Sequence, residues 1–474
     1  MNLKIIGAGY RDGDMTQAAV KAVVASDCVI LKSKKLDCAG FVKKSGADFV
    51  ALDGLYESAA NFDELNASVV DFVTKKAETA KNAVFVVGGA GYDDLTAAEL
   101  IRRGADIIPG VSASAYAAAE LVKSGAARRQ KGGDSGAAFF GGFGVCAVSA
   151  QELIGTECFF PDKRFCLAVG DIDDKYTASD LKLRLSDIYG DVRVLILHSG
   201  GRTLETTLFE LDGQKKAFYD YRTTLIIPPS DMLDNIVHDM SDLYAIMKRL
   251  RGKDGCKWDI AQTHKSLRIN VIEEAYELAD AIDKDDIDMM LEESGDVLLQ
   301  AVFHAVIAED DNEFSLRDVI NALCVKLITR HTHIFGDDKA ADEREALSVW
   351  DKAKTREKKY KDLTDKMNSV PESFPALLRA EKVLKTAFKA AKAGEKNADS
   401  PLEDYAARIS QKIRTIDTAD AEGRGVIGGE ILLDTAECLA ARGVEPETAL
   451  RDAVNAFINR FAARERGQKG DETP

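Results

Sequence analysis

Two short acidic segments, Glu273-Glu274-Ala275-Tyr276-Glu277 and Glu293-Ser294-Gly295-Asp296, decide how the middle of this chain folds. Residues three positions apart on a helix share a face, so each segment places two carboxylates side by side. Apolar residues recur around both segments at helical spacing, which predicts two helices that face a core. These apolar residues are Val271, Ile272, Ala275, Leu278 and Ile282 in the first helix and Leu291, Val297, Leu298, Ala301 and Val302 in the second.

The spacing of the two segments indicates a metal site. Glu293 follows Glu277 after sixteen residues, which is the length of a helix, a turn and a returning helix. Packing the two helices would bring Glu274, Glu277, Glu293 and Asp296 together, where like charges repel and desolvation is costly. A hard divalent cation relieves this repulsion, and ligation by oxygen alone favours Mg2+ or Mn2+. The alternative for a single acidic segment is a solvated helix face, but the paired pattern favours a metal.

Further motifs flank the acidic pair in a fixed order. They are residues 247–251 (MKRLR), 255–259 (GCKWD), 262–264 (QTH), 326–336 (KLITRHTHIFG) and 349–354 (VWDKAK). With these motifs, the segment from residue 243 to about 360 resembles a MazG-type nucleoside triphosphate pyrophosphohydrolase domain. The resemblance implies an all-α, metal-dependent enzyme that splits a nucleoside triphosphate (NTP) into a nucleoside monophosphate and pyrophosphate.

The same resemblance assigns roles to individual residues. It implies metal ligation by Glu274, Glu277, Glu293 and Asp296, with Glu273, Glu274 and Glu277 as the catalytic carboxylates. Glu273 is the spare carboxylate that could accept a proton from the attacking water.

Three cations and one tryptophan are candidates for substrate binding. Lys326, Arg330 and Lys354 suit phosphate oxygens, Arg330 through its planar fork and the lysines as point charges. The alternative for Lys326 and Arg330 is a solvated helix face. Trp258 could stack on a base or ribose, and packing in the core is the open alternative.

The first half of the chain has the pattern of an α/β domain. Apolar strands are expected at residues 3–6, 28–31, 84–87 and 105–108, with helices at 15–25 and from 114 to about 123. Strands that run into glycine-rich loops and then helices predict a largely parallel sheet. Glycines at strand ends let a ligand approach the backbone.

The glycine-rich loops of this half resemble those of the tetrapyrrole methylase family. The resemblance rests on Gly7-x-Gly9, on residues 88–91 (GGAG) and on residues 108–112 (IPGVS), and it covers about residues 1–230. It implies S-adenosylmethionine binding near Gly7, Gly9, Gly88, Gly89, Gly91 and Ser112. The first loop reads Gly-Tyr-Arg-Asp-Gly-Asp where the family usually has Gly-Pro-Gly-Asp, so a scaffold or ligand sensor without methyl transfer stays an alternative.

The sequence therefore predicts three parts. Residues 1–229 are a tetrapyrrole-methylase-like α/β domain, residues 235–362 a MazG-type helical domain, and residues 370–466 a degenerate second helical repeat. The second repeat has residues 425–429 (GVIGG) where the acidic clusters belong, which excludes a metal site built from those residues. We expect it to serve packing or dimerisation, and the family resemblance implies a homodimer.

Composition favours a cytoplasmic enzyme that acts on a small molecule. The chain has 474 residues and a net charge of −16, which argues against a nucleic-acid partner. No apolar stretch is long enough for a membrane span and no secretory signal is evident. The eight cysteines contain no C-x-x-C pair and predict neither a disulfide framework nor a zinc site. Three functions stay open: an NTP pyrophosphohydrolase, a methyltransferase, and a non-catalytic regulator that binds nucleotides.

Overall fold

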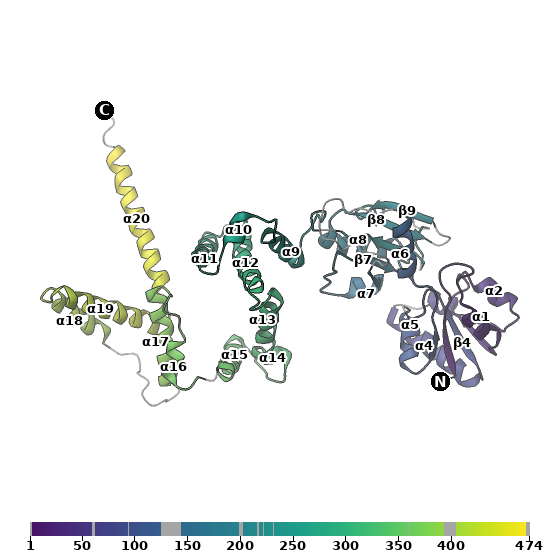
Figure 1. Ribbon diagram of the computed structural model, residues 1–474. Coiled ribbons are helices and arrows are strands. Elements are labelled where there is room, and N and C mark those ends of the chain that lie inside the picture. The colour runs from purple at the N-terminus through teal and green to yellow at the C-terminus, as the bar shows by residue number, and fades with distance from the viewer. Residues whose placement is uncertain are drawn as a thin grey trace. The chain divides into compact units, whose positions relative to one another are not determined.

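The computed structural model describes residues 2–58, 62–92, 94–124, 144–198, 202–215, 218–220, 222–230, 232–358, 360–392 and 404–470. The chain forms two compact units, Met1–Leu316 and Arg317–Pro474. This division falls inside the predicted range 235–362, and the predicted domain boundaries stay predictions. The fold class is confirmed, because α/β structure is followed by helices alone (Figure 1).

The chain begins with a five-stranded parallel sheet in the order β3-β2-β4-β1-β5. Its strands are β1 (Leu3–Gly7), β2 (Cys28–Leu31), β3 (Phe49–Ala51), β4 (Ala83–Val87) and β5 (Asp106–Ile108). The helices are α1 (Gln17–Val24), α2 (Ala39–Lys44), α3 (Asp53–Ser58), α4 (Phe62–Thr79), α5 (Leu95–Arg102) and α6 (Ala113–Ser124). Strand β4 is buried along its whole length, as expected for a central strand covered on both faces. Helices α4 and α5 pack on one face of the sheet, and α1 and α2 pack on the other.

A second five-stranded sheet has the order β6-β7-β10-β8-β9. Its strands are β6 (Val145–Ser149), β7 (Cys166–Gly170), β8 (Arg193–His198), β9 (Arg202–Thr207) and β10 (Thr224–Ile227). Helices α7 (Ala150–Gly155) and α8 (Lys175–Tyr189) cover one face, and α6 covers the other. Only β6 and β7 run parallel, so the expected largely parallel arrangement holds for the first sheet and not for this one.

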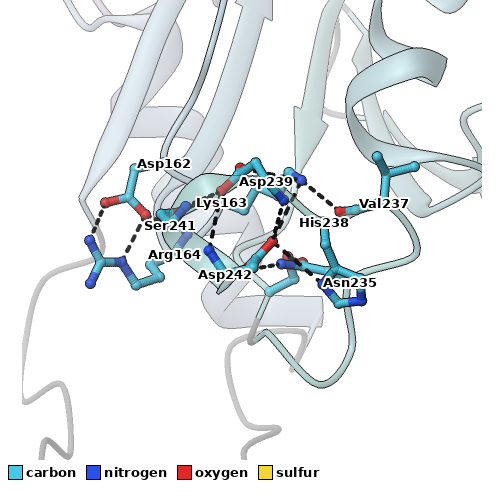
Figure 2. Close-up of polar contacts among 10 residues, drawn as sticks. Asp162, Lys163, Arg164, Asn235, Val237, His238, Asp239, Ser241 and Asp242 are labelled. Atoms are coloured by element: carbon cyan, nitrogen blue, oxygen red, sulfur yellow. Dashed lines mark hydrogen bonds and ion pairs between the residues drawn. The ribbon is translucent and has the colours of Figure 1, made fainter. Parts of the chain in front are cut away.

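A buried lysine ties the second sheet to the first helix of the helical part (Figure 2). Lys163 donates a hydrogen bond of 2.7 Å to the carbonyl of Val237, and its ammonium lies 3.5 Å from Asp239 and 4.0 Å from Asp242. Asp239 and Asp242 form the capping box that starts α9 (Met240–Leu250). Ion pairs and a hydrogen bond from Lys163 therefore hold the start of α9 against the second sheet.

Three further helices complete the first unit. They are α10 (Lys257–Ala261), α11 (Arg268–Asp283) and α12 (Ile287–Asp310). Met247 of α9 and Leu267 pack against Val302, Phe303 and Val306 in the C-terminal half of α12. This small core fixes one end of α12 and leaves its N-terminal half to pair with α11.

The second unit is all helical. It contains α13 (Leu316–Arg330), α14 (Thr332–Phe335), α15 (Glu343–Lys358), α16 (Leu363–Asn368), α17 (Ala376–Lys392), α18 (Tyr405–Ile416), α19 (Ala421–Ala441) and α20 (Pro446–Gly470), with α13 starting one residue before the unit. Across the described residues of both units, no helix has the length and apolar character that a membrane crossing requires.

The helices of the predicted second repeat are joined by ion pairs. Arg408 of α18 pairs with Asp434 of α19 and lies 3.5 Å from Glu437. Lys412 of α18 lies 2.8 Å from Asp434 and 3.2 Å from Glu430. The carboxylates of α19 are thus neutralised within the repeat by cations of α18.

The glycine loops of the first sheet come so close together that a side chain would collide with backbone. A Cβ atom on Gly7 would lie 2.3 Å from the carbonyl oxygen of Ala90 and 2.5 Å from the amide nitrogen of Gly110. We expect Gly7→Ala to lower the free energy of unfolding by about 1–3 kcal/mol, as overpacking does. Gly40→Ala is the control, because Gly40 lies in α2 with open space around it. Denaturant unfolding followed by circular dichroism measures both variants, and equal effects would contradict the packing argument.

Candidate metal centre

Helices α11 and α12 form a pair that is joined by a tight turn. Asp285 in the turn adopts a φ of 52°, and Asp286 caps α12 by accepting a hydrogen bond of 3.1 Å from the amide of Met289. The turn reverses the chain after α11, so both acidic segments can face the same space. The helix–turn–helix geometry expected from the spacing is therefore present.

Three carboxylates of the two acidic segments come together between these helices. One oxygen each of Glu274, Glu277 and Glu293 lies within 4.8 Å of the others. The side chain of Glu293 is buried, with 7% of the residue exposed, and its Oε2 has no hydrogen-bond partner. Asp296 is close enough to act electrostatically on both Glu274 and Glu293.

Within the described part of the chain, the charges that act on Glu274 and Glu293 are negative. Burial, followed by the charges of Asp296 and Glu277, raises the pKa of Glu274. Burial, followed by the charges of Glu277 and Asp296, raises the pKa of Glu293. Four carboxylates and an orphaned buried oxygen fit a hard divalent cation, which prefers oxygen ligands. The structure thus brings the predicted ligands Glu274, Glu277 and Glu293 together, and Asp296 is near enough to act on Glu274 and Glu293 electrostatically.

Glu273, the predicted proton acceptor, stands apart from this group. It precedes Glu274 on α11, but its side chain is exposed and it does not belong to the three-carboxylate cluster. Its position leaves it accessible to water beside the cluster.

The apolar residues around the acidic segments do not face a core within this chain, which corrects the prediction from their spacing. Leu278 is half-buried and Val302 is buried. The other predicted core residues are exposed: Val271, Ile272, Ala275, Ile282, Leu291, Val297, Leu298 and Ala301. The reason is geometric, because the carboxylates occupy the faces by which α11 and α12 meet. The apolar stripes therefore lie on the outside of the pair.

Trp258 is exposed rather than packed in the core. Its residue surface is 60% exposed, and the ring meets Phe303 of α12 edge-on with 6.4 Å between ring centres. The carbonyl of Trp258 accepts a hydrogen bond of 3.0 Å from the side chain of Gln262. The alternative of a core tryptophan is therefore wrong, whereas stacking on a nucleotide stays a prediction.

The three predicted phosphate-binding cations belong to the second unit. Arg330 is buried and donates a hydrogen bond of 2.8 Å to Glu357, which lowers the pKa of that carboxyl. Arg330 and Lys354 both lie on the ring of Trp350, at 5.3 and 4.8 Å from its centre. Lys326 is exposed on α13. The structure thus brings Arg330 and Lys354 together, and a solvated face is wrong for Arg330.

The predicted cofactor residues of the α/β half form a closely packed set of loops. Gly9 and Gly89 exchange two backbone hydrogen bonds of 2.9 Å, and Gly91 lies against the backbone of Gly7. Gly88 directly precedes Gly89, and Ser112 accepts a hydrogen bond of 3.2 Å from the amide of Ala115 in α6. The space that a side chain on Gly7 would occupy is filled by backbone, so Gly7 permits the close packing of these loops. S-adenosylmethionine binding stays a prediction.

One residue of the cluster is missing from the sequence-based set. Gln300 lies on α12 four residues after Asp296, is 8% exposed, and its side chain hydrogen-bonds Glu274. The signal was present in the sequence, because a residue four positions after Asp296 lies on the same helix face. The residue type did not indicate a ligand, because Gln300 is a neutral amide among carboxylates.

Comparison with known proteins agrees with this site. Residues 262–335 match the family described as the MazG nucleotide pyrophosphohydrolase domain. The chain is 36% identical over 224 residues to the nucleoside triphosphate pyrophosphohydrolase/pyrophosphatase MazG of Thermotoga maritima, covering 47% of this chain and 84% of that protein. It is 30% identical over 394 residues to the uncharacterized protein YabN of Bacillus subtilis, covering 81% of this chain and 76% of that protein. The chain belongs to the MazG family of nucleoside triphosphate pyrophosphohydrolases.

A solved structure also resembles part of the chain. Uroporphyrin-III C-methyl transferase from Thermus thermophilus, complexed with S-adenyl homocysteine, matches 47% of this chain and 96% of its own with 18% identity and a TM-score of 0.31. At that TM-score the likeness carries no conclusion about activity. The MazG match is the family that the motifs of residues 243 to about 360 resemble.

The repulsion within the cluster has a measurable effect on metal-free protein. Because the pKa of Glu293 is raised on folding, stability is lost as the pH rises from the unfolded pKa of glutamate through the folded one, and the loss is complete above the folded pKa. We expect metal-free Glu293→Gln to be more stable than wild type at neutral pH, with the difference shrinking toward about pH 4, where unfolded glutamate also takes up a proton. With Mn2+ present the order should reverse. Urea unfolding in EDTA measures this, with the exposed Glu313→Gln as control. A Glu293→Gln variant no more stable than the control at neutral pH would contradict the prediction.

Proposed function

We propose that the reaction of this family, hydrolysis of an NTP to a nucleoside monophosphate and pyrophosphate, takes place at the carboxylate cluster of α11 and α12. The observation that carries the proposal is the group formed by Glu274, Glu277 and Glu293, with a buried oxygen of Glu293 left unpaired. Together with Asp296, these residues would hold a divalent cation, Mg2+ or Mn2+. When bound, the cation supplies positive charge that neutralises the triphosphate as the anhydride bond breaks.

The remaining steps fall to the side chains of the chain itself. Glu273 is the proposed proton acceptor, because it is exposed beside the cluster and can take a proton from water as the oxygen bonds to phosphorus. Trp258 is proposed to stack on the base or ribose, which its exposed face supports. Lys326, Arg330 and Lys354 are proposed to hold phosphate oxygens. A phosphate that binds Arg330 would take the place of the Glu357 carboxylate as its partner.

We also propose that the protein is a homodimer through the outer face of α11 and α12. The exposed apolar residues of this face include Ile272 and Ile282 of α11 and Leu291 and Leu298 of α12. Several exposed apolar residues on one helix pair support an interaction site there, because large exposed apolar patches mark such sites. A second copy offers a matching apolar stripe, since a two-fold interface uses the same patch on both subunits.

Nothing in the described residues favours methyl transfer by the α/β half over a scaffold role. The loops that carry the resemblance are packed against each other at Gly7 and Gly110. Binding of S-adenosylmethionine therefore rests on the resemblance alone.

The hydrolase proposal is tested by pyrophosphate release from a panel of ribo- and deoxyribonucleoside triphosphates with Mg2+. We expect Glu274→Gln combined with Glu277→Gln to lower the rate by about 100-fold or more, because lost electrostatic stabilisation has that magnitude. The control combines Glu292→Gln with Glu313→Gln, which removes the same charge from exposed positions outside the cluster. Circular dichroism establishes that both variants fold. Wild type that binds NTP without releasing pyrophosphate would favour a nucleotide-binding regulator instead.

The dimer proposal predicts that a charge on the outer face separates the subunits. Leu291 is 77% exposed, and Leu291→Asp should weaken self-association by about 100-fold or more, because an unpaired charge would be buried in the interface. The control is Leu183→Asp, because Leu183 is 65% exposed but lies on α8 in the α/β half. Sedimentation velocity at several concentrations measures both variants. A monomeric wild type, or equal association of the two variants, would overturn the assignment of this face.

A further inference from the structure

Gln300 occupies an unusual position for a neutral polar side chain. It lies on α12 seven residues after Glu293 and four after Asp296, so the three side chains share one helix face. Only 8% of the residue is exposed. A long amide side chain is seldom buried to this extent without partners for both of its ends.

The two ends of the Gln300 amide have different surroundings. The amide group lies close enough to the carboxyl of Glu274 to favour its ionised form, whereas burial and the neighbouring carboxylates raise the pKa of Glu274 overall. An ionised carboxylate only accepts hydrogen bonds, so the nitrogen of Gln300 is the donor. The Oε1 atom is fully buried and has no hydrogen-bond partner. Both atoms are bonded to one carbon, so the unpaired oxygen lies beside the carboxylate cluster.

A buried carbonyl oxygen without a partner lowers stability, so a purely structural residue at this position would be apolar. A leucine would fill similar space without leaving an oxygen unpaired. Glu293 presents a second buried oxygen without a partner in the same cluster. Two orphaned acceptors among carboxylates point to a positively charged occupant.

We infer that Gln300 is a member of the cation site, with its Oε1 as a neutral ligand and its NH2 group holding Glu274 in position. This inference rests on the proposed function, because it assumes that the cluster of Glu274, Glu277, Glu293 and Asp296 holds a divalent cation. The charge balance explains why the residue is an amide. Four carboxylates already exceed the charge of one divalent ion, and a neutral oxygen adds a ligand without adding repulsion.

The test measures Mn2+ binding to the full-length protein without nucleotide, by isothermal titration calorimetry. In Gln300→Leu, which loses both the ligand and the donor, the dissociation constant for Mn2+ should rise by about 10- to 100-fold. Val302→Ala is the matched control, because Val302 is buried on the same helix but packs in the apolar core with Met247. Its substitution should lower thermal stability and leave Mn2+ binding unchanged.

A second variant keeps the test decisive if Gln300→Leu folds poorly. Gln300→Glu keeps an oxygen at this position but replaces the amide donor with a fifth carboxylate. Its melting temperature in EDTA should fall below that of wild type, and Mn2+ should raise it by more than it raises wild type.

Each outcome separates the two claims. Wild type that binds no Mn2+ would overturn the metal centre itself, and with it the inference. Wild type that binds Mn2+ while Gln300→Leu binds it equally well would overturn the role of Gln300 alone. Equal stabilisation of wild type and Gln300→Glu by Mn2+ would do the same.

Discussion

Repulsion among carboxylates held between two helices is the constraint on which the helical half depends. One oxygen each of Glu274, Glu277 and Glu293 lies within 4.8 Å of the others, and burial raises the pKa of Glu274 and Glu293. A fold that keeps such a cluster must either bind a cation or accept a lasting loss of stability. Two contacts offset that loss. The apolar core at the C-terminal half of α12 holds α12 against α9, and Lys163 holds the segment before α9.

The carboxylates also decide which surfaces of the helix pair are exposed. A helix has one face toward its neighbour, and carboxylate side chains occupy much of that face in α11 and α12. Their remaining apolar residues, among them Ile272 and Leu291, are displaced to the opposite side. One arrangement thus produces both a polar interior site and an apolar exterior, so the proposed metal binding and the proposed self-association would involve the same two helices.

The sequence predicted more of the local structure than of its packing. The strand at residues 28–31 has the predicted bounds, because a short apolar run between turns has few other solutions. The acidic segments predicted their own convergence, because residues three apart on a helix share a face. The same periodicity wrongly predicted that Val271 and Leu298 are buried. A helical period shows which residues share a face, but it does not show what covers that face. At Gly7 the sequence does not show why glycine is needed, because close loop packing and ligand approach both require a residue without a side chain.

The two predicted helical repeats balance their buried carboxylates in different ways. In the second repeat, Asp434 is buried but pairs with Arg408 and Lys412 from the adjacent helix, so its charge is neutralised within the fold. In the first repeat, no lysine or arginine forms an ion pair with Glu274, Glu277 or Glu293 among the described residues, and the only neutral partner identified is an amide. A lysine or arginine side chain is fixed to the chain, whereas a metal ion can exchange with solvent and can also bind a phosphate oxygen. The repeat without its own cations is therefore the one suited to chemistry.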